Sequence, residues 1–349
     1  MRKASLIILI IAITLIAVAC SKKDEGAKEK GSTTNNEATP ETNIYPYTGI
    51  KTDDEVTDRA IAVMVNNHPQ ARPQSGLSKA DIVFEMLTEG DITRFLAIYQ
   101  STAPEVVGPV RSAREYFFTL ADEGYDAIYV YHGAANFVND MIKTRGIENL
   151  PGAVYDNDGH LFVRESFRKA PHNSYFQFGA AYDVAEEKGY DTKLNYEALL
   201  FTDDESDVEG EEANSVQINY SSTSTVRFDY DESDQKYTRY NDGEQTVELD
   251  TNEPIKVDNV FIVETEHRVI DEERRRFIDI ESGGSAYLFQ RGKVQKIDWE
   301  NRDGRIIPVK DGQVVPFVPG QTWINFVPTT PAKGVSEQIQ ILMNDVTVE

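Results

Sequence analysis

A single cysteine, at position 20, constrains what this chain of 349 residues can fold into. One thiol cannot form an intramolecular disulfide, and it excludes a CxxC redox centre and a zinc site built from several cysteines. The fold must therefore be stabilised by hydrophobic burial, and the chain is long enough for about two domains with their own cores. Hydrophobic residues make up 40% of the sequence, which is enough to form such cores.

The residues before Cys20 have the composition of a secretory leader. Two basic residues stand at positions 2 and 3, and residues 6–19 form an apolar run that is short for a membrane span. The run ends in the sequence AVAC, which resembles a bacterial lipobox, where the cysteine sulfur is acylated and the chain is cleaved before it. We therefore predict a lipoprotein signal peptide over residues 1–19 and lipidation of Cys20. The alternative is an ordinary signal peptide that happens to contain a cysteine.

The net charge of the chain limits the kinds of partner that it can bind. The chain carries 59 acidic against 35 basic side chains, a formal net charge of −24. Nucleic-acid binders need stripes of Lys and Arg that contact phosphates, so we expect no nucleic-acid partner. Anionic lipids repel an acidic surface as well. We expect the protein to meet the cell membrane through its lipid anchor alone, on the outer, extracytoplasmic face.

Shifts in composition divide the rest of the chain. Residues 20–45 are mostly polar and charged, which is typical of a flexible tether. Residues 202–215 concentrate acidic side chains, which repel one another and stay solvated, so we predict an acidic linker there. This linker separates an N-terminal domain (46–201) from a C-terminal domain (216–330), and a C-terminal tail (331–349) follows.

The N-terminal domain is predicted to be an α/β domain with a mixed sheet, because strand and helix patterns alternate in it. Capping-box spacing, a serine followed three residues later by Glu or Gln, predicts one helix from Ser112 to Gly124 and another from Ser174 to Gly189. A tight hairpin turn is expected at 89–91. Short apolar runs predict strands at 61–65, 82–87, 92–99 and 126–131.

The C-terminal domain is predicted to be β-rich and mainly antiparallel, so the whole chain falls in the α+β class. Its turns carry Asn, Asp, Arg and Gly in the pairs that tight hairpins require, at 241–243, 291–292, 303–304 and 311–312. The predicted strands are 216–220, 225–230, 236–240, 260–263, 286–290, 294–299 and 323–327.

The most informative segment for function is GPVRSARE at 108–115. Arg111 and Arg114 flank Ser112 at the predicted start of a helix, where the helix dipole already contributes partial positive charge. An anion would be held there by backbone N–H groups and by the guanidinium groups, so the functional interpretation of this segment is an anion or phosphate site. The alternative is a structural network in which Glu85, Glu89 or Glu115 pairs with these arginines.

A second polar cluster, at 66–76, follows a predicted core strand. Loops that leave the carboxyl end of a strand commonly carry ligands in α/β folds. On this basis we expect a binding face that also includes residues at other strand ends, with Glu85 and Glu89 positioning its arginines. Its further members are His68, Arg72, Arg94, His132 and His172.

The histidines of this face have a second interpretation, because a lone histidine is more often a satisfied hydrogen-bonding group than a ligand. No close histidine pair indicates zinc, and no nucleophile elbow, P-loop or dinucleotide fingerprint is present. We therefore predict no metal, no cofactor and no catalytic residue.

Long strings of this sequence resemble the YerB family of bacterial lipoproteins. They are AIAVMVNNHPQARPQSGLSKADIVFEML, EGDITRFLAIYQS, EVVGPVRSARE and GQTWINFVP, and the resemblance extends over residues 46–330. It implies two domains of uncharacterised function, on a lipid-anchored protein at the outer face of a Gram-positive-type membrane. It implies no reaction.

A looser similarity connects the Arg94 strand and the turn at 109–111 with the LytR-CpsA-Psr phosphotransferases, in which arginines hold a polyprenyl pyrophosphate. This chain has Ser112 where that family has an aspartate. We expect a protein that binds an envelope component or a partner protein and is not an enzyme. The alternatives are an enzyme acting on phosphorylated or polyprenyl-linked envelope precursors, and a purely structural interaction module.

Overall fold

The computed structural model describes residues 43–204, 208–329, 339–343 and 346–347. Cys20 and most of the predicted tether lie outside these ranges, as do residues 205–207 of the acidic linker. Within the described part of the chain, no helix combines the length and the apolar character needed to cross a membrane.

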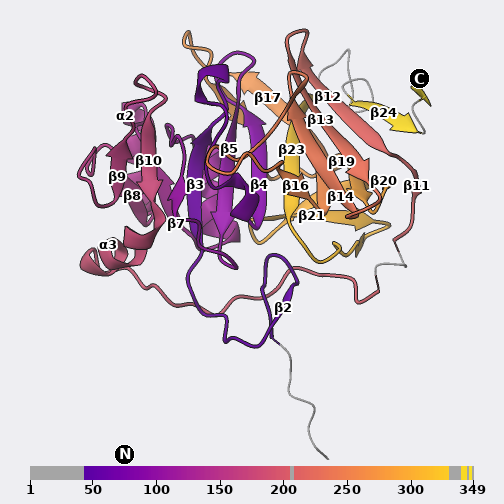
Figure 1. The fold of residues 1–349 in the computed structure, drawn as a ribbon, viewed down its shortest axis with the longest axis horizontal. Helices are drawn as coiled ribbons and strands as arrows, with labels where there is room; N and C mark the ends of the chain where they lie inside the picture. The colour runs from indigo at the N-terminus through magenta and orange to yellow at the C-terminus, as the bar shows by residue number, and fades with distance from the viewer. Residues whose placement is uncertain (1–42, 205–207, 330–338, 344–345, 348–349) are drawn as a thin grey trace, which may run out of the picture. The chain divides into compact units, whose positions relative to one another are not determined.

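A mixed sheet of 13 strands, counted over the described residues, runs through both predicted domains (Figure 1). At its centre the C-terminal strand β23 lies between β17 and β4 and is parallel to both. From one edge to the other, the order is β22 (Gln313–Val314), β21 (Arg305–Lys310), β20 (Lys293–Arg302), β19 (Gly284–Gln290), β17 (Asn259–Val269), β23 (Thr322–Thr329), β4 (Ile82–Leu87), β5 (Thr93–Tyr99), β3 (Ile61–Asn66), β7 (Ile128–Tyr131) and β8 (Asn149–Pro151).

Two short strands extend this sheet at its sides. They are β11 (Glu211–Glu212), which pairs with β20, and β18 (Arg276–Ile278), which pairs with β17. The residues of the N-terminal and C-terminal parts thus share one continuous ladder through the pairing of β23 with β4. The acidic segment before β12 also contributes a strand, β11, to it.

The central strands form because they are apolar on both faces. In β3, Ile61, Val63 and Val65 face one core while Ala62 and Met64 face the other, and all are fully buried. Strands covered on both faces read as continuous hydrophobic runs, as this one does. One core is closed by helices α1 (Glu115–Thr119) and α2 (Asn136–Arg145), and the other by a second sheet and by α3 (Ala181–Glu187).

The second sheet is antiparallel and packs over the face that carries Val63. It includes β24 from the predicted C-terminal tail, paired with β12. Its strands are β15 (Glu244–Gln245), β14 (Lys236–Asn241), β13 (Ser224–Asp231), β12 (Ser215–Ser221), β24 (Ile339–Met343) and β25 (Val346–Thr347), with β16 (Lys256–Val257) beside β14.

Smaller elements complete the chain. A π-helical turn, η3 (Leu120–Gly124), continues α1, and a two-stranded and a three-stranded sheet lie apart from the main ones. These sheets contain β1 (Asn43–Ile44) and β2 (Lys51–Thr52), and β6 (Val106–Val107), β10 (Ser174–Gln177) and β9 (Phe162–Arg164). The 3-10 turns are η1 (Pro69–Ala71), η2 (Leu77–Lys79) and η4 (Phe178–Ala180).

The predicted fold class is confirmed: a mixed sheet occupies the N-terminal region and antiparallel strands the C-terminal region. The hairpin turns at Asp242-Gly243 and Asp303-Gly304 have positive φ at both residues, as their composition predicts.

Both predicted helix starts are wrong. Helix α1 begins at Glu115 after Arg114, and no side chain caps it. Ser174 opens strand β10, and its hydroxyl contacts His132 instead of a helix terminus. The predicted end of the first helix at Gly124 is confirmed by the π-helical turn. Helix α2 was not predicted, because Ala135 precedes it in place of a capping residue.

Candidate functional site

The carboxyl ends of the parallel strands β3 and β7 form the base of the candidate site. The segment 109–113 fills the space between them: the Arg111 N–H donates to the Met64 carbonyl at 2.9 Å, and the His132 N–H donates to the Arg111 carbonyl at 3.0 Å. Arg111 is thereby fixed at a sheet edge where loops from several segments meet. This edge is where α/β folds bind ligands.

Arg111 is a half-buried cation with no anionic partner. Among the described residues, its guanidinium has no carboxylate within ion-pair distance and no hydrogen-bond acceptor. Burial and then the charge of Arg94 lower the pKa of Arg111 to about 10. It stays protonated at neutral pH, so a positive charge is held here without a counter-charge from the protein.

Two histidines stack close enough to this guanidinium for its charge to lower the pKa of each ring. His68 follows β3 and His172 precedes β10, and their ring centroids lie 4.6 Å apart with the planes at 23°. Asn66 fixes the ring of His172: its Oδ1 accepts from the His68 N–H at 3.0 Å, so its Nδ2 donates to His172 Nδ1 at 2.9 Å. His68 Nδ1 accepts from the Gln70 N–H at 3.1 Å.

In both rings Nδ1 therefore acts as the acceptor, and the proton is assigned to Nε2. No acceptor for either Nε2–H occurs in the part of the chain that the structure describes. Burial lowers the pKa of both histidines, and Arg111 lowers each further. At neutral pH the two rings are uncharged donors next to a charged one.

His132, at the end of β7, has a positioning role. Its Nε2 accepts from the Arg164 guanidinium at 3.2 Å, because a guanidinium can only donate, and its Nδ1–H donates to the Ser174 hydroxyl at 2.7 Å. Burial and then Arg164 lower its pKa, so the ring is neutral. Gly152 makes room for it, since a Cβ there would lie 2.6 Å from His132 Nδ1.

The other arginines near Arg111 are engaged in structural contacts. Glu89, at the turn between β4 and β5, forms ion pairs with both Arg94 and Arg114. Arg94 also donates to the Ser112 carbonyl at 2.7 Å. The expected structural network therefore exists for these two arginines and does not include Arg111.

Helix α1 does not direct its dipole at this site. Helix α1 has only five residues, and Arg111 lies outside it. The Ser112 hydroxyl lies next to Gly133, 3.5 Å from where a Cβ on that glycine would be. Glu115 pairs with Arg145 on α2.

Glu85 does not position the arginines of this site. It lies on the opposite face of the sheet from Arg94, and both of its carboxylate oxygens accept from Arg239 Nη2, at 2.9 and 3.0 Å. Both side chains are fully buried. Trp323 and Thr93 also donate to this carboxylate, at 2.9 and 2.8 Å. Arg94 lies opposite Met86 in the ladder, so the two side chains share a face of the sheet. Glu85 is the neighbour of Met86 on β4, and adjacent residues on a strand point to opposite faces, so Glu85 points away from Arg94.

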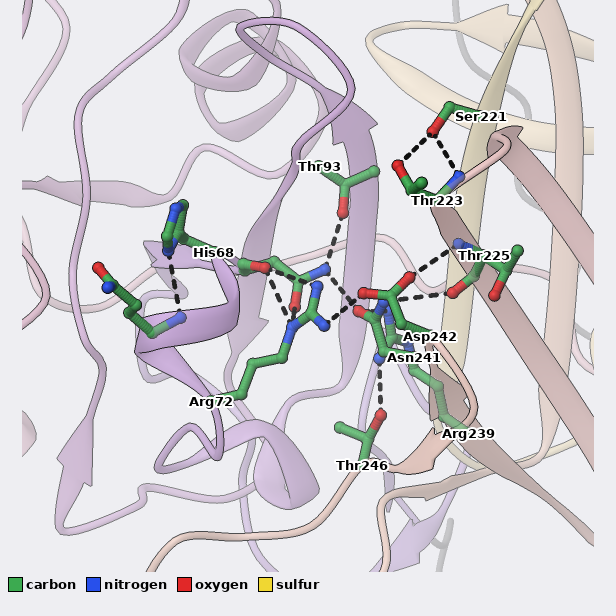
Figure 2. A network of polar contacts seen from close by, with 12 residues as sticks. His68, Arg72, Thr93, Ser221, Thr223, Thr225, Arg239, Asn241, Asp242 and Thr246 are labelled. Atoms are coloured by element: carbon green, nitrogen blue, oxygen red, sulfur yellow. Dashed lines mark hydrogen bonds and ion pairs between the residues drawn. The ribbon is translucent and has the colours of Figure 1, made fainter.

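Arg72 connects the loop after β3 to the second sheet. Its Nη1 contacts Asp242 Oδ2 at 2.7 Å, in the turn after β14, while its Nε and Nη2 donate to the Asn67 carbonyl (Figure 2). Figure 2 shows this contact beside the buried Arg239. Arg72 is near His68, whose pKa it lowers, but its guanidinium is occupied.

Models of one protein family match most of the chain. The model described as "Protein of unknown function (DUF3048) N-terminal domain" matches residues 47–191, and the corresponding C-terminal domain model matches residues 216–324. The chain belongs to the DUF3048 family. This assignment confirms the resemblance seen in the sequence.

A curated relative and a solved structure agree with the family. Over 344 residues, this DUF3048 chain is 45% identical to "Putative lipoprotein YerB" of Bacillus subtilis (strain 168), covering 97% of this chain and 99% of the relative. The crystal structure of the YerB protein from Bacillus subtilis matches with a TM-score of 0.78 and 46% identity, over 86% of this chain and 99% of that one.

Sequence reasoning missed several residues that shape the site of this DUF3048 protein. Arg164 and Ser174 fix His132, and Arg239 neutralises Glu85. No local motif marks them, because each acts on a residue far away in the chain.

Proposed function

We propose that this DUF3048 protein is a lipid-anchored extracytoplasmic binding protein that takes a phosphate-bearing component of the cell envelope at an anion site. The anion site consists of Arg111, His68 and His172. The observation that carries the proposal is the Arg111 guanidinium, which is half-buried and has no acceptor among the described residues. A buried cation without a partner is costly, and a bound anion removes that cost.

The donors of the anion site suit an oxyanion. A guanidinium presents several N–H groups in one plane, and it binds phosphate oxygens in pairs. His68 and His172 add one Nε2–H each from two other segments. A tetrahedral phosphate has enough oxygens to accept from three separate directions, whereas a carboxylate has only two.

The charge around the anion site is local. The chain as a whole carries a net charge of −24, which repels anions at long range. Selectivity for an anion must therefore come from the contacts of Arg111 and its neighbours. Glu89 does not neutralise Arg111, because Arg94 and Arg114 occupy its carboxylate.

The cellular location in this proposal follows from the predicted lipid anchor. The relative named as a lipoprotein supports a lipoprotein identity for this chain. Lipidation at Cys20 and exposure on the outer face of the membrane complete the proposal, because phosphate-bearing polymers and lipids are then within reach.

The test is a titration of the purified protein with sulfate and with inorganic phosphate, measured by calorimetry and by NMR of the histidine rings. We expect Arg111→Gln to weaken sulfate binding about 10- to 100-fold, the cost of one charge-assisted contact. The matched control is Arg145→Gln, which removes an arginine that is paired with Glu115 on the surface. Equal sulfate affinity in Arg111→Gln and the wild type would refute the anion site.

A further inference from the structure

A cavity of about 500 Å³ lies between helices α1 and α2 and the two-stranded ribbon of β17 and β18. Its floor is apolar: Tyr116, Val138, Ile278 and Ile280 line it, and each side chain is buried. Pockets that bind small molecules have volumes of about 300–1,000 Å³ and mostly apolar walls. The size and lining of this cavity fit that class.

The mouth of the cavity exposes large hydrophobic side chains. Phe137 on α2 is 40% exposed, and Ile270 and Phe277 on the ribbon are 47% and 36% exposed. Single exposed apolar residues are ordinary, but a group around one opening marks a binding surface. An apolar chain entering the cavity would cover all three.

Two arginines that line the cavity each carry one unmet donor. The Nε–H of Arg114 and the Nε–H of Arg276 are both buried, and neither has an acceptor among the described residues. Buried donors are almost always satisfied, so each of these two calls for an acceptor.

The charge at the cavity favours a single negative charge. Arg114, Arg145, Arg268 and Arg275 each have a carboxylate partner, whereas Arg276 has none among the described residues and donates to the Gly90 carbonyl at 2.6 Å. Carboxylates also border the cavity: burial, Glu123 and Asp279 raise the pKa of Glu281. A second negative charge would be repelled by them.

We infer that this cavity binds a monoanionic amphiphile of the fatty-acid class, with its alkyl chain on Val138 and Ile278 and its carboxylate on Arg276. The site is separate from the anion site and stands on different residues, so neither proposal depends on the other.

The probe is dodecanoate, kept below its micelle-forming concentration and titrated into the protein by calorimetry. We expect one saturable equivalent. Arg276→Gln should weaken binding about 10- to 100-fold, because Arg276 is the one arginine lining the cavity that has no carboxylate partner among the described residues. The matched control is Arg274→Gln, an exposed arginine in the same ribbon that does not line the cavity, with a change below about twofold.

Two further measurements test the site without relying on the Arg276→Gln variant. Thr119→Trp places a large side chain in the cavity while leaving Arg276 in place, and it should also abolish dodecanoate binding. Dodecyltrimethylammonium, with the same chain and a positive head, should bind far more weakly. The inference is overturned if dodecanoate shows no saturable binding, if it binds Arg276→Gln as well as the wild type, or if Arg111→Gln abolishes its binding.

Discussion

The imidazole rings of His68 and His172 stack with centroids 4.6 Å apart, although the residues belong to loops more than a hundred positions apart in the chain. Both rings accept a hydrogen bond at Nδ1, and Arg111 lies close enough to lower the pKa of each. The stack is therefore neutral at pH 7 and gains charge only in acid.

Sulfate affinity is expected to rise as the pH falls below about 6.5, the ordinary histidine pKa. Protonation of His68 or His172 adds positive charge next to a bound anion, and by linkage the bound anion raises the pKa of both rings. Sulfate remains a dianion across this range, so its own charge is constant. Calorimetry at pH 7.5 and 5.5 checks this, with NMR titration of the rings. The double variant His68→Gln with His172→Gln should flatten the pH dependence, and an unchanged slope in it would contradict the assignment.

Arg111→Gln and Arg114→Gln should differ in their effect on stability, because Arg111 is proposed to bind an anion and Arg114 is part of the structural network. Arg111 has no ion pair with any described residue, so its substitution should leave the melting temperature unchanged or raise it slightly. Arg114 is buried and paired with Glu89, so its substitution should cost about 1–3 kcal/mol of unfolding free energy. Denaturant unfolding of both variants measures the difference. A large loss of stability in Arg111→Gln would place this arginine in the structural network.

Glu85→Gln alone should be strongly destabilising. It leaves Arg239 as a buried charge without its partner, which typically costs about 3–5 kcal/mol. The double change Glu85→Met with Arg239→Met should cost less than the sum of the two single Met changes, since neither charge is then left alone. Urea unfolding of the four proteins of this cycle measures the coupling. Additive losses would show that the pair does not act as a unit.

His267 should make the protein less stable in acid. Burial, and then Arg276, lower the pKa of His267 to about 3, and both its ring nitrogens are buried without a partner among the described residues. The unfolded chain binds this proton near pH 6.5 and the folded one does not, so stability falls as the pH drops from 6.5 towards 3. The slope from this group is at most about 1.4 kcal/mol per pH unit.

Replacement of the ring tests the role of His267. His267→Leu should reduce that slope in denaturant unfolding between pH 7 and pH 4, and it should not lower stability at pH 7, because it removes two unsatisfied polar atoms. His160→Gln, at an exposed histidine, is the control and should leave the slope unchanged. A slope in His267→Leu equal to that of the wild type would show that this ring titrates normally.

Cys20→Ser should release the protein from membranes. The predicted lipid is attached through this sulfur, and the apolar run at residues 6–19 is short for a membrane span. Fractionation of cells followed by detection of the protein in the soluble fraction measures the effect. Membrane retention of the serine variant would refute the anchor.

The strands could be predicted because their signals are local. Val63 and its neighbours form a continuous apolar run, and the Asp-Gly turns require a backbone conformation that few other pairs adopt. The predicted helix starts are wrong because a capping box, although equally local, is a weaker signal than an apolar run or an Asp-Gly turn. Ser174 has the right spacing, yet its pairing with Arg164 in the three-stranded sheet overrides it.

The site could be predicted only as a set of candidates. The loops that carry His68, Arg111, His132 and His172 follow strand ends, and the structure brings them together. Which arginine stays unpaired depends on where the Glu89 carboxylate lies, and the turn between β4 and β5 decides that. Spacing along the sequence carries no such information.

The pairing of β23 with β4 has a consequence for assembly. Strand β4 ends at Leu87, and its neighbour begins at Thr322. A nascent chain therefore presents β4 as an unprotected edge until almost all of its length has been synthesised, and such edges invite pairing with other chains. The high sequence separation of this contact makes its formation slow. Folding of this protein must finish late, with its last long strand closing the middle of the sheet.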